Sequence, residues 1–338
     1  MSSLRQLSRT ITTIVIVVTV SILGLPAPTT DEGEEPTTVG ANKERHVTPP
    51  SPSKQWQAAS PPAQQPALAI PPGQPLRVSV DNNGAEGAST SLLPTVSATG
   101  RFIAFRSHAN LAPGDSPNAD IYVRDTCLGA PPDCVPSTQI VSIGSDGLPA
   151  NGESARPSIS GDGRFVAFES LANNLVANDS NNRTDVFVRD TCAGAMGCTP
   201  STTRVSVASN GAQAATGGFR SAISSSGRFV AFESDSTDLV AGDTNDANDI
   251  FVRDTCQSGP PGCVPSTVRV SLANNGAQAI GGDSANPAMS PDARFIAFES
   301  FATNLVTGVT DTNNVQDVFL RDTCRGAAPG CTPSTILI

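Results

Sequence analysis

Lysine is nearly absent from this 338-residue sequence, which contains only Lys43 and Lys54. Acidic residues outnumber basic ones, with 31 Asp and Glu against 21 Lys and Arg, and the formal net charge is -10. Binding to phosphates depends on basic side chains that release counterions, so no nucleic acid is expected as a partner. An anionic membrane surface is disfavoured for the same reason.

Histidines and catalytic motifs are also scarce. The two histidines are His46 and His108, and the sequence contains no Gly-x-Ser-x-Gly run, phosphate-binding loop or nucleotide fingerprint. Paired carboxylates can form a glycosidase site, but Glu169, Glu233 and Glu299 recur with the repeat described below, and recurrence favours a structural role. We therefore expect a protein that is not an enzyme and has no cofactor.

The N-terminal part divides into two segments. Residues 1–27 carry Arg5 and Arg9 before the apolar stretch Ile11–Leu25, as in a signal peptide or an uncleaved membrane anchor. About fifteen residues is short for a bilayer span, which favours the signal peptide. Residues 28–75, rich in Pro, Thr, Ser and Gln, are expected to form a disordered linker. The sequence thus predicts an exported protein, periplasmic, cell-surface or secreted, that contacts a membrane only if this first segment is retained.

The rest of the sequence states one unit of roughly 65 residues four times. The copies end in similar runs that finish with a cysteine: Ile121–Cys127, Asp185–Cys192, Asp249–Cys256 and Asp317–Cys324. The steps from cysteine to cysteine are 65, 64 and 68 residues. Such a period indicates a supersecondary unit that buries its faces against its neighbours.

Turn signals divide each unit into four short strands. In the second copy, a run that begins at Pro157 and a Gly-Asp-Gly turn precede the strand Arg164–Ser170, and Asp185–Asp190 and Thr203–Ala208 follow. The strand Arg164–Ser170 is apolar on both faces, as expected for a sheet packed between two others. The predicted fold class is all-β, a β-propeller of four four-stranded blades over residues 76–338. The predicted blades cover approximately 77–138, 139–202, 203–266 and 267–338.

The recurring motifs also carry a family resemblance. The runs SxDGRFVAFES, NLVxxDxN, DVFVRD and RVSVASNG resemble the TolB-like, WD-repeat-like β-propeller proteins of bacterial envelopes. The resemblance covers Leu76–Ile338 and implies a propeller fold with a mostly non-catalytic binding or scaffolding role. A cysteine-bearing insertion between the third and fourth strands departs from the short connection usual in that family.

The strand count leaves ring closure open. Arg77–Val80 matches a fourth strand and Thr335–Ile338 begins another, so five fourth-strand starts accompany four sets of the other three strands. Three arrangements fit this count: a four-bladed ring closed by Arg77–Val80, part of a longer propeller, or two chains in an eight-bladed ring. An open ring would expose a strand edge at which the chain can associate with itself.

Each unit holds two of the eight cysteines. In an exported chain, disulfides across the hairpin of the third and fourth strands are expected. The predicted links are Cys127–Cys134, Cys192–Cys198, Cys256–Cys263 and Cys324–Cys331. Zinc is the alternative, but the spacing is wider than in zinc knuckles and no histidine is near.

The loop between the second and third strands carries Asp and Asn at fixed spacing. The triplets are Asp179, Asn181 and Asp185, then Asp243, Asn245 and Asp249, then Asp311, Asn313 and Asp317, and the first copy has the contracted set Asp115, Asn118 and Asp120. Oxygen ligands at such spacing suggest calcium, whereas Asp and Asn that cap a tight turn give a structural explanation. The second explanation is favoured, because the middle ligand and the turn glycine of a calcium loop are missing.

Partner binding is expected where the copies differ. Alternate connections of antiparallel strands share a face, so the triplet loops lie with the connections that lead into each first strand. The candidate residues on this acidic face are Leu92, Leu93, His108, Arg156, Phe219 and Arg220. They predict a non-enzymatic protein that binds a protein or glycan of the cell envelope. The alternative is a propeller hydrolase or lyase that acts on polysaccharide, with an unsymmetrical carboxylate pair in a central pocket.

Overall fold

The structure is a computed structural model that describes residues 75–306, 313 and 315–338. The predicted signal segment and nearly all of the predicted linker lie outside the described residues. All regular elements of the described part are β-strands. No helix in this part is long and apolar enough to cross a membrane.

The strands form four groups of four. They are β1 (Ser91–Val96), β2 (Phe102–Ser107), β3 (Asp120–Asp125) and β4 (Ser137–Ile140); β5 (Ser154–Ile159), β6 (Phe165–Ser170), β7 (Asp185–Asp190) and β8 (Ser201–Arg204); β9 (Phe219–Ile223), β10 (Phe229–Ser234), β11 (Asp249–Asp254) and β12 (Ser266–Arg269); β13 (Ser284–Met289), β14 (Phe295–Ser300), β15 (Asp317–Asp322) and β16 (Ser334–Leu337). We call these groups blades 1 to 4. Each is an antiparallel sheet with its strands in sequence order.

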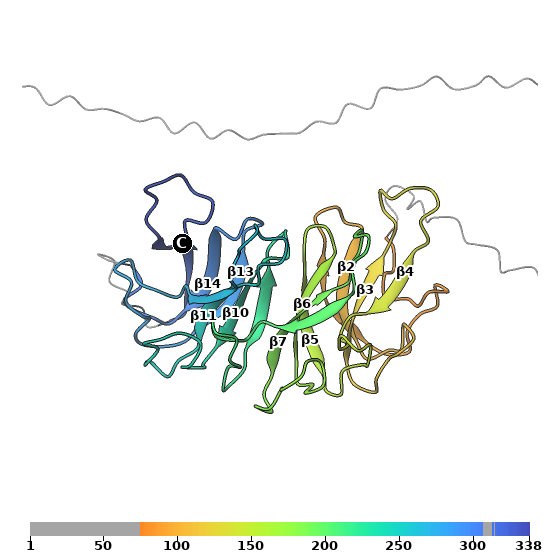
Figure 1. The fold of residues 1–338 in the computed structure, drawn as a ribbon, viewed down its shortest axis with the longest axis horizontal. Coiled ribbons are helices and arrows are strands. Elements are labelled where there is room, and N and C mark those ends of the chain that lie inside the picture. The colour runs from red at the N-terminus through yellow and green to blue at the C-terminus, as the bar shows by residue number, and fades with distance from the viewer. Residues whose placement is uncertain (1–74, 307–312, 314) are drawn as a thin grey trace, which may run out of the picture. The chain divides into compact units, whose positions relative to one another are not determined.

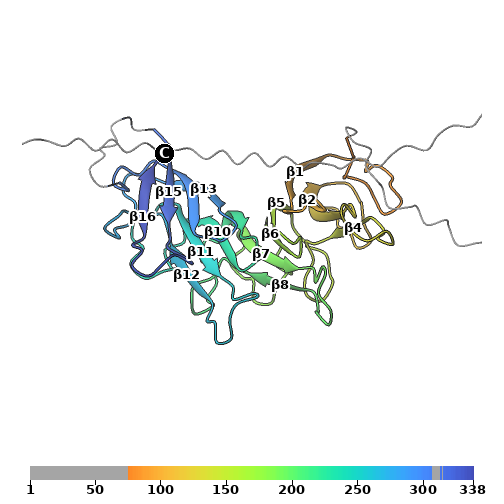
Figure 2. The same ribbon diagram turned by 90° about the horizontal axis from the view of Figure 1, so that it is seen from above.

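The blades follow one another along an arc, with the first strands on its inner side and the fourth strands outside (Figures 1 and 2). The all-β propeller prediction is therefore confirmed. The fourth strand was placed too late: the prediction was Thr203–Ala208, whereas β8 is Ser201–Arg204. The predicted blade boundaries consequently fall inside or at the edge of the fourth strands.

The core lies between neighbouring blades rather than within one blade. Ala104, Ile121 and Val123 of blade 1 pack against Phe168 and Phe187 of blade 2, and all five are at most 1% exposed. The same pattern joins blade 2 to blade 3 and blade 3 to blade 4. Because both faces of an inner blade are covered, its strands are apolar on both sides, as the sequence predicts.

Recurring polar residues tie together the end of each blade that carries the cysteines. Arg164 stacks on the Phe165 ring, with its guanidinium carbon 4.8 Å from the ring centroid, and pairs with Asp190. The Asp190 carboxylate also accepts a hydrogen bond from the backbone N–H of Cys192 at 2.8 Å. Each blade repeats these contacts. These recurring residues thus serve the fold.

The segment that begins at Arg77 does not join the sheet of blade 4, which contains only β13 to β16. It lies on blade 1, where Thr138 Oγ1 donates a hydrogen bond to the Val80 carbonyl at 2.6 Å. In blade 2, Thr202 Oγ1 donates in the same way to the Ile143 carbonyl, which follows β4. The segment therefore replaces the end of a preceding blade, and the four-bladed ring closed by Arg77–Val80 is not the arrangement of this structure.

Candidate functional site

The first strand of every blade has a kink at the same position. A bulge shifts the pairing register at this point, for example between Ala155 and Ser158. One residue of each kink adopts the left-handed conformation: Leu93 at φ 54°, Arg156 at 50°, Arg220 at 51° and Asn286 at 52°. Non-glycine residues adopt this conformation at a cost of roughly 1–3 kcal/mol. The backbone kink recurs in every blade, whereas its side chain is Leu in blade 1, Arg in blades 2 and 3, and Asn in blade 4.

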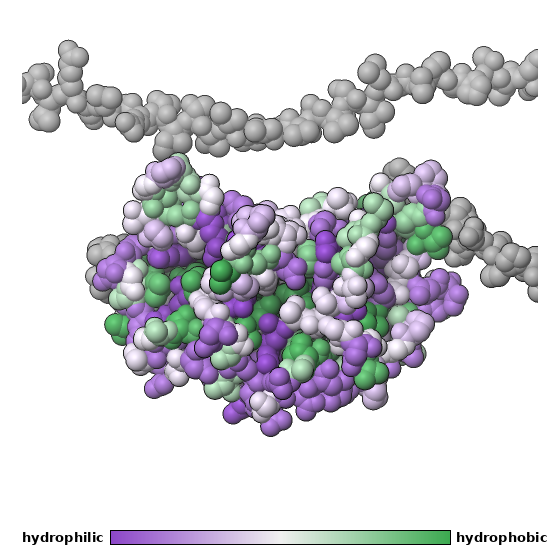
Figure 3. Space-filling view, viewed as in Figure 1, coloured by the Kyte–Doolittle hydropathy of each residue, from purple (hydrophilic) through white to green (hydrophobic). Residues whose placement is uncertain are grey.

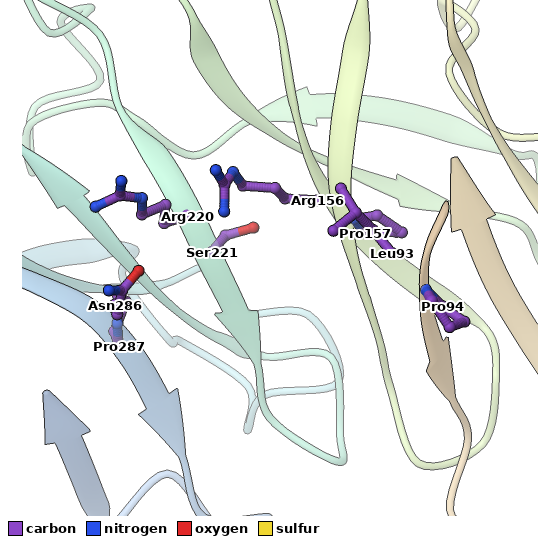
Figure 4. A pocket seen from close by; sticks show the side chains of 8 residues that line it. All are labelled: Leu93, Pro94, Arg156, Pro157, Arg220, Ser221, Asn286 and Pro287. Carbon is purple, nitrogen blue, oxygen red and sulfur yellow. The ribbon is translucent and has the colours of Figure 1, made fainter. Parts of the chain in front are cut away.

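These four kink residues, each with the residue that follows it, line one pocket. Its volume is about 310 Å³ and the following residues are Pro94, Pro157, Ser221 and Pro287. Figure 4 shows the side chain of Arg156 extending toward β9, the strand that carries Arg220 and Ser221. The Arg156 and Arg220 side chains are 47% and 35% exposed. The pocket thus brings two accessible guanidinium groups together with an amide and apolar rings.

Glutamates of the second strands hold the kinks in place. Glu169 accepts the backbone N–H of Arg220 in the next blade at 2.8 Å and pairs with Arg156 Nε of its own blade at 3.2 Å. Glu233 likewise accepts the backbone N–H of Asn286 at 3.2 Å and pairs with Arg220 at 3.1 Å. Burial raises the pKa of Glu233, and Arg220 partly opposes this. These contacts agree with the structural role that the recurrence of the glutamates predicts.

Blade 1 breaks this symmetry. Arg106 stands where the other blades have glutamate, and its Nη2 donates to Glu153 Oε2 at 3.0 Å and its Nε to the Ser154 carbonyl at 3.1 Å. Leu93 is the apolar member of the kink residues and is 45% exposed. The kink residue that lines the pocket is therefore apolar in blade 1 and polar in blades 2 to 4.

The structure brings together three of the six predicted binding residues, Leu93, Arg156 and Arg220. Leu92 and Phe219 each precede a kink residue; Leu92 is 50% exposed, and Phe219 is half-buried with the Arg220 guanidinium 5.8 Å from its ring centroid. His108 is exposed outside the pocket, and its backbone N–H donates to the Thr90 carbonyl.

His108 corresponds to Leu171 of blade 2 and Phe301 of blade 4, whose backbone N–H groups donate in the same way to the carbonyls of Glu153 and Asp283. The Ser107 and Ser170 residues that precede them occupy the same register position in their sheets. His108 is therefore a variable, exposed residue at the end of a strand.

Asn286, Ser221 and the three prolines of the pocket are not among the binding residues predicted from the sequence. Asn286 and Ser221 also lie where the copies differ, and an alignment of the four kinks identifies them. The left-handed backbone of the kinks could not be predicted from glycine in the sequence, because none of the four kink residues is glycine. Only the strand register shows that they line one pocket.

The Asp and Asn triplets of blades 2 and 3 enclose an arginine. In blade 3, Arg269 Nη1 lies 2.8 Å from Asp243 Oδ1 and 2.9 Å from Asp249 Oδ2, and Asn245 Nδ2 donates to Asp249 Oδ2. In blade 2, Arg204 and Gln213 contact Asp179 and Asp185, and Asn181 Nδ2 donates to Asp185 Oδ2 and to the Ala214 carbonyl. These contacts confirm that the triplet loops share a face with the connections to the first strands. A guanidinium among the carboxylates fits the structural explanation of the triplets.

The other two blades differ at this position. Blade 1 has Ile140 and blade 4 has Leu337 where blades 2 and 3 have the arginine. In blade 1, Tyr122 donates its hydroxyl hydrogen to Asp115. In blade 4, Asn313 Nδ2 donates to Asp317, and Asp311 lies outside the described residues.

All four predicted cystines are present: Cys127–Cys134, Cys192–Cys198, Cys256–Cys263 and Cys324–Cys331. Each closes the connection between the third and fourth strands of one blade. The cysteines are thus part of the repeat and lie at the end of the blades opposite to the triplet loops.

Comparisons with known proteins bear on the fold alone. No protein-family model and no curated protein matches the chain. Among solved structures, TolB from Acinetobacter baumannii is 16% identical over 74% of this chain and 44% of that chain, with a TM-score of 0.40. A TolB protein from Agrobacterium tumefaciens is 16% identical over 76% and 67%, with a TM-score of 0.40. The β-propeller domain of the Trilobed protease from Pyrococcus furiosus is 11% identical over 73% and 57%, with a TM-score of 0.37.

Proposed function

We propose that this chain is an exported, non-enzymatic β-propeller protein that binds a protein or glycan of the cell envelope in the pocket of the kink residues. One observation carries the proposal. The kink has the same backbone in every blade, but its side chains are Leu93, Arg156, Arg220 and Asn286. A position whose backbone serves the fold and whose side chain does not is free to serve recognition.

The chemistry of the pocket favours a partner with acidic or hydroxyl groups. Arg156 and Arg220 each use part of the guanidinium on a glutamate and are still more than a third exposed. Planar guanidinium groups bind carboxylates and sulfates through paired hydrogen bonds. Leu93 and the prolines add apolar contact area beside these donors. An acidic glycan or an acidic peptide segment combines these properties.

Two further features support export and binding rather than catalysis. Four disulfides fit an oxidising compartment. The carboxylates nearest the kinks, Glu169 and Glu233, are each held by an arginine and a backbone N–H, which suits a scaffold better than an acid–base pair.

The test compares Arg156→Gln/Arg220→Gln with the wild-type chain. Glutamine keeps an N–H donor for the glutamates but removes the charge, so the fold should be retained. Arg183→Gln is the matched control, because Arg183 is exposed on a loop and does not line the pocket. We expect wild type and control to capture the same envelope glycan or protein, on a glycan array or from envelope extract, and the double variant to lose it. Cleavage of the captured molecule by the wild-type chain would contradict the non-enzymatic proposal and support the alternative, a propeller hydrolase or lyase.

A further inference from the structure

The face of blade 4 that points away from blade 3 exposes apolar side chains that are buried in every other blade. Val318 is 45% exposed, whereas Ile121, Val186 and Ile250, at the same position in blades 1 to 3, are fully buried at 0%. Leu320 and Ala297 are half-buried, while their counterparts in the other blades are at most 1% exposed. The surface that covers such residues between blades is thus missing on blade 4.

The face of blade 1 that points away from blade 2 also exposes side chains that the other blades bury. Val96 is 58% exposed, whereas Ile159 and Ile223 at the same position are each 8% exposed. Ile103 is half-buried, although Val166 and Val230 are fully buried. In the view of Figure 3, which shows the side of the outer strands, apolar and polar residues are mixed along the blades.

The three interfaces inside the chain show what covers each face. At every one, residues equivalent to Val318 and Leu320 pack against residues equivalent to Val96 and Ile103 of the next blade: Ile121 and Val123 against Ile159 and Val166, for example. Blades 4 and 1 therefore carry the two halves of an interface that the described blades form three times with one another.

Polar groups at the two ends match as well. Glu169 and Glu233 accept the backbone N–H of the next kink residue, and on blade 4 the equivalent glutamate is Glu299. The kink residue of blade 1 that would donate to it is Leu93, which has the same left-handed backbone as the others. One bond differs: Ser225 N–H donates to the Pro291 carbonyl, but Pro291 itself has no N–H for a following blade.

The N-terminal segment continues the register from Ser79, one position beyond the equivalent of Ile338. The Ile338 N–H donates to the Val318 carbonyl at 3.0 Å, as the Val205 N–H does to the Val186 carbonyl at 2.8 Å. Ser206, the residue after Val205, donates to Asp185, and Ser79 has the equivalent position in the N-terminal segment. Ser79 of a second copy would thus lie beside Asp317.

We propose that two copies of this chain associate head to tail, so that blade 4 of each covers blade 1 of the other and both form one ring. Two sets of four blades give eight, the upper end of the usual propeller range. A two-fold axis relates the two head-to-tail contacts, and the closed pair leaves neither blade face uncovered. Both junctions form together, which strengthens the association. The ring also places the kink residues of both copies around one central opening.

The mass of the full chain, measured by light scattering after size exclusion over rising concentration, tests the proposal. We expect the mass of two chains. Val318→Glu/Leu320→Glu should give a folded single chain with an unchanged circular dichroism spectrum. Val264→Glu, a matched change at a residue that is 78% exposed on a cystine loop, should stay paired. A single chain at every concentration overturns the proposal, and so does a Val318→Glu/Leu320→Glu variant that stays paired.

A cysteine pair tests the arrangement itself. Ser158 Oγ accepts the Ile223 N–H across the interface of blades 2 and 3 at 3.1 Å, and the equivalent residues at the proposed junction are Ala288 and Val96. We expect Val96→Cys/Ala288→Cys to form covalent pairs of chains on non-reducing gels, and each single variant to form none. Absence of covalent pairs in the double variant, with the chains still associated, overturns the head-to-tail arrangement.

Discussion

Arg164 donates two parallel hydrogen bonds to Asp190, from Nε to Oδ1 at 2.8 Å and from Nη2 to Oδ2 at 2.7 Å. The two residues are 26 positions apart in sequence. Their side chains are 25% and 8% exposed, so the pair is shielded from much of the solvent. This pair explains two recurring motifs at once, because the arginine belongs to the Gly-Arg-Phe run and the aspartate to the Arg-Asp-Thr-Cys run. This pair and its equivalents in the other blades join the second and third strands at the end of the blade where the cystine lies.

Replacement of Asp190 by asparagine should lower the free energy of unfolding by about 1.5–3 kcal/mol, the usual range for hydrogen bonds to charged groups. The equivalent Asp322→Asn in blade 4 is the matched control, since its pair is more exposed and should matter less. Urea denaturation monitored by circular dichroism measures both. Equal losses of unfolding free energy in the two variants would contradict the view that shielding from solvent strengthens the pair of Arg164 and Asp190.

Removal of one cystine should also destabilise the chain. For a loop of about seven residues, the chain-entropy model gives roughly 2.4 kcal/mol, so Cys192→Ala/Cys198→Ala should unfold at lower urea concentration than wild type. Peptide mapping without reductant should find all four links within single blades. Links between different blades in secreted material would refute the pairing.

Calcium should leave the melting temperature unchanged. In blades 2 and 3 an arginine already lies among the triplet carboxylates, as Arg269 does between Asp243 and Asp249, and its positive charge opposes a cation there. A bound ion at a hundredfold excess over its dissociation constant would add about 2.7 kcal/mol. Thermal melts with added calcium and with chelator measure the effect. A rise of several degrees with calcium would restore the metal explanation of the triplets.

Burial raises the pKa of Asp120 from its ordinary value of 3.8 to about 6. The folded chain then binds this proton more tightly than the unfolded chain, so Asp120 lowers stability as pH rises from about 4 to 6. Asp120→Asn removes this titration, and the stability of the variant relative to wild type should increase over that range. Asp254→Asn is the control, and its stability relative to wild type should change with pH in the opposite direction. Burial acts to raise the pKa of Asp254, but hydrogen bonds from Arg228 and from the backbone N–H of Cys256 lower it below its ordinary value. A difference for Asp120→Asn that does not change with pH would contradict the assignment.

The blade architecture could be predicted because the information is local. Runs such as Phe165–Ser170 and the turns between them identify strands without knowledge of the neighbours. The fourth strand was misplaced because the apolar run after Arg204 continues beyond the sheet, where Val205 packs against the next blade. The pocket could be predicted only in part. Leu93, Arg156 and Arg220 were found because the copies differ there, but their left-handed backbone depends on a bulge that only the pairing of two strands defines.

The kink residues should contact the partner, whereas the cystine end of the blades should not. Photocrosslinking tests this expectation directly, with benzoylphenylalanine placed at Leu93, which lines the pocket, or at Met196, which is fully exposed on a cystine loop. After irradiation in envelope extract, mass spectrometry identifies the adducts and separates those with a second copy of the chain. We expect an adduct with a distinct envelope molecule from position 93 and none from position 196. The same molecule captured from position 196, and none from position 93, would contradict this expectation.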